Sequence, residues 1–196
     1  MNYSIFDVDG TILDSMEVWN TLASRYIQSL DRIPEKNLDK IVSEMSLEQS
    51  AIYLKKRYRI YKQEEVIISE VLNLISDFYK YEVKLMPGFK DFITHFDSMN
   101  VIGTSCDEEL VKSALKRLGV LDYFEDIITC SKVNKGKDDP GFYLACADIL
   151  KQKPDNIFVF EDADYCIDAA RKVGFKVIKI KDWRDLNEEC INNCGK

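Results

Sequence analysis

The chain has 196 residues, which suits one large domain or one domain with an insert, because a single domain commonly holds ~150 residues. Apolar residues make up 46% and charged residues 31%, with 8 Gly and 4 Pro, a composition that excludes disordered and collagen-like chains. The 27 Lys and Arg against 34 Asp and Glu give a net charge of −7, which argues against sequence-independent binding to nucleic acid or anionic membranes.

The first predicted element is a buried strand at Tyr3–Phe6. This short apolar run ends in the polar turn Asp7-Val8-Asp9-Gly10-Thr11. Two acids, Asp7 and Asp9, are therefore expected at the carboxyl end of a buried strand.

A helical block follows, from Glu17 to about Tyr81. Apolar residues recur there at helical spacing, as at Val18, Leu22 and Tyr26, and the stretch contains one Pro and no Gly. The pattern predicts an all-helical segment inserted after the first strand.

The insert sets the expected domain boundaries. We expect a core domain of residues 1–14 and 84–196 and a helical domain of residues 15–83. The two connections are expected near Leu13–Ser15 and Val83–Met86.

Beyond Pro87-Gly88, apolar runs alternate with helical patterns. The predicted strands are Val101–Gly103, Ile127–Thr129, Ile157–Phe160 and Val177–Ile180. Several are apolar on both faces, which is typical of parallel strands covered by helices on both sides. The sequence therefore predicts a doubly wound α/β domain with a parallel sheet.

Polar residues follow these strands where open α/β sheets bind ligands, at the carboxyl ends. They are Asp7, Asp9, Thr104, Ser105, Lys137, Glu161 and Asp162.

Four motifs in this order resemble the haloacid dehalogenase superfamily, in its subgroup with a helical cap after the first strand. Asp7–Thr11 is similar to the DxDGT motif, and Val101–Thr104 to the apolar run that ends in Thr or Ser. Gly136–Pro140 is similar to the lysine motif, and Val159–Asp162 to the acidic motif. The resemblance implies a Rossmann-like core and spans nearly the whole chain.

The resemblance also implies a Mg²⁺ site. Asp7 and Asp162 would be side-chain ligands together with the backbone carbonyl of Asp9, and Glu161 would be a direct ligand or would act through a neighbour. The chemistry agrees, because acids at strand ends without a nearby Arg repel one another and a divalent cation holds them together.

The catalytic roles come from the same resemblance. Asp7 would attack phosphorus and form an aspartyl-phosphate, and Asp9 would serve as general acid and base. Thr104, Lys137 and the backbone N–H of Ser105 would bind the phosphoryl oxygens. Asp138 and Ala163 depart from the family pattern, but neither position supplies a reacting group.

Two further departures favour a phosphatase over a β-phosphoglucomutase. Trp19 stands where the mutases have a His, and Leu47 stands near their cap Arg. Dehalogenases lack the acid at Asp9, which favours phosphoryl transfer. The expected substrate is a small phosphate ester such as a sugar phosphate, and the mutase remains the alternative.

Two non-enzymatic alternatives stay open: a phospho-aspartate signalling receiver and a slow homologue that only binds its ligand. The helical insert and the DxDGT motif on the first strand disfavour the receiver.

No run approaches the roughly 20 apolar residues of a membrane span, and no secretory signal begins the chain. We therefore expect a cytoplasmic protein, monomeric by default. Free thiols are expected, since the six cysteines form no CxxC; they are Cys106, Cys130, Cys146, Cys166, Cys190 and Cys194.

Overall fold

The computed structural model describes residues 2–43 and 45–185. These residues divide into two compact units. The first falls within Met1–Asp14 and Lys84–Lys196, and the second within Ser15–Val83.

The first unit contains a five-stranded sheet in the order β3-β2-β1-β4-β5, with every neighbouring pair parallel. The strands are β1 (Asn2–Phe6), β2 (Ser98–Thr104), β3 (Ile127–Thr129), β4 (Ile157–Glu161) and β5 (Lys176–Lys179). The first strand lies at the centre, between β2 and β4. The sheet confirms the predicted parallel α/β fold.

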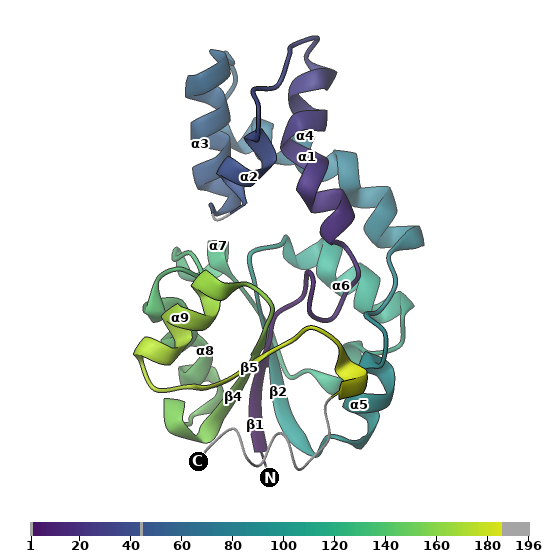
Figure 1. Ribbon diagram of the computed structural model, residues 1–196, viewed down its shortest axis with the longest axis vertical. Coiled ribbons are helices and arrows are strands. Elements are labelled where there is room, and N and C mark those ends of the chain that lie inside the picture. Colours follow the sequence, from purple (N-terminus) through teal and green to yellow (C-terminus); the bar gives the residue numbers. More distant parts are fainter. Residues whose placement is uncertain (1, 44, 186–196) are drawn as a thin grey trace. The chain divides into compact units, whose positions relative to one another are not determined.

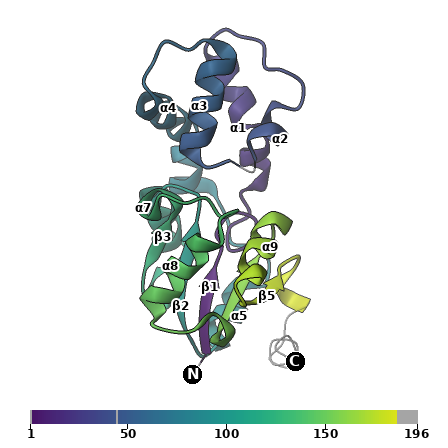
Figure 2. The same cartoon turned by 90° about the vertical axis from the view of Figure 1, so that its left-hand side faces the viewer.

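Helices cover both faces of the sheet (Figures 1 and 2), with α5 and α6 on one side and α7, α8 and α9 on the other. Their bounds are α5 (Phe89–His95), α6 (Glu108–Arg117), α7 (Cys130–Val133), α8 (Pro140–Leu150) and α9 (Asp164–Lys172). Short 3-10 helices complete the unit at η2 (Leu121–Tyr123), η3 (Pro154–Asn156) and η4 (Trp183–Asp185).

The two faces of the sheet have different cores. On the α8 and α9 side, Ile5, Val101 and Val159 of three adjacent strands pack with helix residues such as Phe142 and Ala170. Asp7 and Glu161 lie two residues after Ile5 and Val159, respectively. Because side chains alternate along a strand, both acids point to this same side of the sheet.

The opposite face carries an aromatic cluster. Its members are Phe6, Phe89, Phe92, Phe96, Phe124, Phe160 and Trp183. Phe6 and Phe160 are paired in register and stack with ring centroids 4.5 Å apart. The residues directly before Asp7 and Glu161 are thus fixed by packing.

One strand differs from its predicted bounds by more than one residue at an end. The strand β2 begins at Ser98, three residues before the apolar run, because its backbone pairs with β1 from Asn2 onward. Polar side chains in this part of the strand bond within the protein: the hydroxyls of Ser98 and Ser4 lie 2.9 Å apart, and Asn100 Nδ2 donates to the Tyr123 carbonyl at 3.0 Å.

The second unit is helical, as predicted. Its elements are α1 (Met16–Ser29), α2 (Leu38–Val42), α3 (Leu47–Tyr58), α4 (Glu64–Asp77) and the π-helical turn η1 (Phe78–Glu82). A capping box between Ser46 and Gln49 begins α3. The helix α4 packs against α1 and α3, and its buried residues include Ile67 and Ile75.

Among residues 2–43 and 45–185, no helix has both the length and the apolar character required to span a membrane. Cys106, Cys130, Cys146 and Cys166 are buried, and within the described residues they carry thiols rather than disulfides. Cys190 and Cys194 lie outside the described residues.

Candidate active site

The candidate site begins with Asp7, which directly follows the central strand. Its backbone N–H donates to the Phe160 carbonyl at 3.0 Å and so continues the pairing with β4. The residue is 7% exposed. A carboxylate is therefore held at the carboxyl end of the sheet with little freedom to move.

Lys137 reaches Asp7 from the loop before α8. Asn134 adopts a left-handed conformation (φ 52°) and ends α7, and Asp139 accepts the Gly141 N–H at 2.7 Å and begins α8. These two turns fix the short loop between them. The Lys137 ammonium is buried and donates to Asp7 Oδ1 at 2.6 Å.

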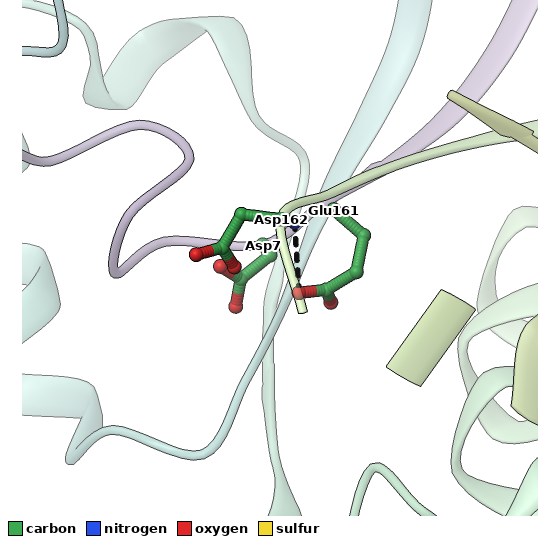
Figure 3. Close-up of side chains that lie close together, drawn as sticks. All are labelled: Asp7, Glu161 and Asp162. Carbon is green, nitrogen blue, oxygen red and sulfur yellow. Dashed lines mark hydrogen bonds between the residues drawn. The ribbon is translucent and has the colours of Figure 1, made fainter. Parts of the chain in front are cut away.

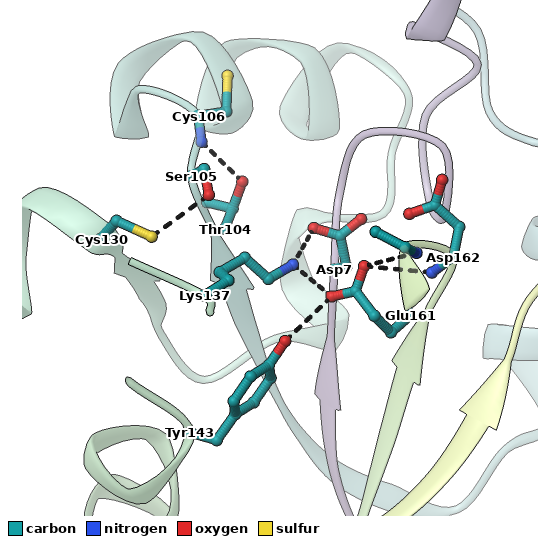
Figure 4. Close-up of polar contacts among 10 residues, drawn as sticks. Asp7, Thr104, Ser105, Cys106, Cys130, Lys137, Tyr143, Glu161 and Asp162 are labelled. Carbon is teal, nitrogen blue, oxygen red and sulfur yellow. Dashed lines mark hydrogen bonds and ion pairs between the residues drawn. The ribbon is translucent and has the colours of Figure 1, made fainter. Parts of the chain in front are cut away.

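Glu161 is the second partner of Lys137 (Figure 4). Its Oε2 forms the ion pair with Lys137 and lies 3.3 Å from the Tyr143 hydroxyl. Its Oε1 accepts the backbone N–H groups of Asp162 and Ala163 at 3.2 and 3.3 Å. Both oxygens of this buried carboxylate are thus engaged within the protein.

Three acids converge at this point. Figure 3 shows Asp7, Glu161 and Asp162 at the ends of β1 and β4, and one carboxylate oxygen of each lies within 4.8 Å of the others. When all three are ionised, Lys137 offsets one charge and leaves two negative charges in excess. An all-oxygen donor set with excess negative charge fits a hard divalent cation such as Mg²⁺.

Burial shifts the proton affinities of the cluster. Burial and repulsion from Glu161 raise the pKa of Asp7 to about 7, and burial and repulsion from Asp7 raise the pKa of Asp162 to about 6. Burial also raises the pKa of Glu161. Burial would lower the pKa of Lys137, but Asp7 and Glu161 raise it well above its ordinary value, so this side chain is an ammonium.

Thr104 and Ser105 occupy the end of the neighbouring strand. Because Phe6 pairs with Ile102, Thr104 lies beside the strand end that carries Asp7. The Thr104 hydroxyl oxygen accepts the Cys106 N–H at 3.0 Å, which leaves its own hydrogen to donate elsewhere. The Ser105 hydroxyl lies 3.3 Å from Cys130 Sγ.

Asp9 lies apart from the three clustered acids. It stands in the turn after β1, is partly exposed, and pairs through its backbone with Leu13. Within the part of the chain that the structure describes, its carboxylate does not belong to the three-acid group. Its charge is nevertheless close enough to contribute to the raised pKa of Asp7.

Asp138 and Ala163 do not disturb this arrangement. Asp138 is exposed, and Lys137 keeps both of its carboxylate partners. The Ala163 N–H donates to Glu161, a contact that needs no side chain.

The sequence motifs did not point to Tyr143. This residue is 1% exposed on α8, with its hydroxyl on Glu161 and its ring against Phe142 at a centroid distance of 5.3 Å. The one signal in the sequence is a hydroxyl within an apolar helical run, six residues after the motif lysine.

Comparison with known proteins gives a family match over most of the chain. The model described as "Haloacid dehalogenase-like hydrolase" matches residues 4–180. The chain is 27% identical over 190 residues to the β-phosphoglucomutase of Bacillus subtilis, a match that covers 92% of this chain and 83% of that protein. It is 26% identical over 194 residues to the phosphorylated carbohydrates phosphatase of Thermotoga maritima, covering 91% and 84%.

The fold is similar to solved structures. The crystal structure of β-phosphoglucomutase from Clostridium difficile superposes with a TM-score of 0.81 at 18% identity, covering 100% of this chain and 97% of that one. At this identity the likeness shows a shared fold.

Proposed function

Because the chain belongs to the haloacid dehalogenase-like hydrolase family, we propose that it is a Mg²⁺-dependent phosphatase that hydrolyses a small phosphorylated metabolite, such as a sugar phosphate. The observation that carries the proposal is the buried Asp7 carboxylate, held by Lys137 and clustered with Asp162 at the end of the central strand. The similarity to a phosphatase of phosphorylated carbohydrates supports the substrate class.

The residues suit a magnesium ion. Asp7 and Asp162 would hold it with their carboxylates, together with the backbone carbonyl of Asp9. When bound, the cation would offset the negative charge of the phosphate and of the acids around it. Since both oxygens of Glu161 already have protein partners, its proposed role is to position Lys137 and the backbone of Asp162.

The proposed reaction has two steps. In the first, an Asp7 oxygen bonds to phosphorus while the bond to the ester oxygen breaks, and Asp9 gives its proton to the leaving alcohol. In the second, a water oxygen attacks the phosphorus of the aspartyl-phosphate and Asp9 takes its proton, which releases inorganic phosphate and restores Asp7. Thr104, Ser105 and Lys137 would bind the phosphoryl oxygens that carry the charge.

Phosphate release from a panel of small phosphate esters tests this function. We expect phosphate release that requires Mg²⁺ and is lost in Asp7→Asn. The control Asp155→Asn, which changes an exposed aspartate outside the proposed site, should retain phosphate release. Mg²⁺ binding without turnover of any ester would contradict the phosphatase and favour a binding protein.

A phosphomutase is the second candidate, favoured by the similarity to a β-phosphoglucomutase. Two residues argue against it. Trp19, at the position expected for a mutase His, donates its Nε1–H to the Tyr79 hydroxyl at 2.7 Å within the helical unit, and Leu47 cannot bind a second phosphate. Robust conversion of β-glucose 1-phosphate to glucose 6-phosphate in the presence of the bisphosphate would replace the phosphatase by the mutase.

A further inference from the structure

Trp183 connects the last described segment of the chain to the turn after β1. It begins η4 and is 1% exposed. Its Nε1–H donates to the Thr11 carbonyl at 2.7 Å, across 172 positions of sequence. Thr11 is two residues beyond Asp9, so one indole contacts the turn that carries the proposed general acid.

The turn itself is closed by its own hydrogen bonds. The Val8 carbonyl accepts the N–H groups of Thr11, Ile12 and Leu13, and Gly10 N–H donates to the Leu13 carbonyl. Gly10 has φ 85°, a conformation that L side chains rarely adopt. A turn closed in this way moves as one piece, so a shift of the Thr11 carbonyl also shifts Asp9.

The indole is in turn fixed to the strands that carry the site. Its ring centroid lies 4.6 Å from that of Phe92, 5.4 Å from Phe160 and 5.9 Å from Phe6. Phe6 and Phe160 directly precede Asp7 and Glu161. Trp183 therefore contacts both the turn that carries Asp9 and the strand residues that directly precede Asp7 and Glu161.

Backbone packing holds η4 from a second side. Gly88, with φ 85°, lies so close that a Cβ there would be 2.9 Å from the Arg184 backbone nitrogen and 3.1 Å from Trp183 Cβ. A larger residue at position 88 would push η4 out of place without changing the indole.

We propose that Trp183 is a positioning residue that holds the Asp9 turn for proton transfer to the leaving group. The inference rests on the proposed phosphatase function and on the role of Asp9 in it. Proton transfer matters most when the leaving oxygen is strongly basic. Loss of the indole hydrogen bond should therefore slow alkyl phosphate esters more than aryl esters whose phenol is acidic.

The test compares Trp183→Phe with the wild-type protein on two substrates: the best sugar phosphate of the panel and p-nitrophenyl phosphate. We expect kcat/KM for the sugar phosphate to fall about 3- to 10-fold more than kcat/KM for the aryl ester, because kcat/KM reports the transfer to Asp7 and excludes the later hydrolysis step that both esters share. Phe92→Leu is the matched control, because it disturbs the same aromatic cluster and leaves the hydrogen bond in place. Equal losses on both substrates in Trp183→Phe would overturn the proposal.

Asp9→Asn separates this inference from the proposed function. If Asp9→Asn lowers kcat/KM for the aryl ester less than for the sugar phosphate and Trp183→Phe shows no such difference, the positioning role fails while the role of Asp9 stands. If Asp9→Asn itself shows no difference between the esters, the proposed acid and base role fails. Should Trp183→Phe not fold, Gly88→Ala displaces η4 and is expected to show the same preference for the aryl ester.

Discussion

Replacing Lys137 by methionine would leave the buried acids without their ammonium partner. Methionine keeps much of the aliphatic stem, so the substitution mainly removes charge. In the wild-type protein the ammonium contacts both Asp7 and Glu161, and all three side chains are less than 9% exposed. We expect Lys137→Met to destabilise the metal-free protein in a strongly pH-dependent way.

The geometry sets the size of the effect. At the 2.6 Å between Nζ and Asp7 Oδ1, Coulomb attraction in an effective dielectric of about 20 amounts to about 6 kcal/mol. The desolvation of the buried ammonium offsets part of this attraction, and breaking such pairs commonly costs about 3–5 kcal/mol. We therefore expect the free energy of unfolding to fall by about 3–5 kcal/mol at about pH 8.

The pH dependence follows from the pKa values of the acids. The pKa of Asp7 is already raised in the folded protein, from 3.8 to about 7, and loss of Lys137 raises it further. The folded state then binds more protons than the unfolded state, so its stability decreases as pH rises. At about pH 5.5 the acids take up protons on folding, and the deficit should shrink to less than half of its value at about pH 8.

Urea unfolding in the presence of a chelator measures the loss of stability in Lys137→Met at about pH 8 and at about pH 5.5. Lys135→Met is the matched control, since Lys135 pairs with Asp139 at an exposed position in the same loop and should change stability little at either pH. A deficit of equal size at both pH values would refute the electrostatic reasoning and assign the loss to side-chain packing.

Three further predictions concern the metal, Glu161 and the helix after β2. Because burial raises the pKa of Asp7 to about 7 and that of Asp162 to about 6, protons compete with Mg²⁺ for these carboxylates. The affinity of the protein for Mg²⁺ should therefore rise at least about tenfold between about pH 5.5 and 7.5, and calorimetry should detect proton release on binding. An affinity that does not change with pH would contradict this. Tyr143→Phe keeps the ring and removes the hydroxyl 3.3 Å from Glu161, so the free energy of unfolding should fall by about 0.5–1.5 kcal/mol in urea titrations; an unchanged value would mean that the contact contributes nothing. Asp107 begins α6 by accepting the N–H groups of Glu109 and Leu110; Asp107→Ala should cost about 1 kcal/mol in the same assay and Asp107→Asn much less, and equal losses would exclude capping as the cause.

The fold class was predictable because it depends on local patterns of apolar residues. Apolar runs such as Ile157–Phe160 alternate with helical periods, and parallel strands buried on both faces require such runs. The helical insert was predictable for the same reason, from helical spacing over a stretch without Gly. The start of β2 at Ser98 was not, because backbone pairing with β1 extends the strand through polar residues.

The sequence also determined which residues stand at the strand ends, since Asp7, Thr104 and Glu161 each follow an apolar run. Only the tertiary structure decided their partners. Lys137 meets Asp7 across 130 positions, and Trp183 meets Thr11 across 172. Local periodicity shows that a side chain is buried. Strand order and helix packing determine which residues surround it, and these depend on contacts between segments that are far apart in the sequence.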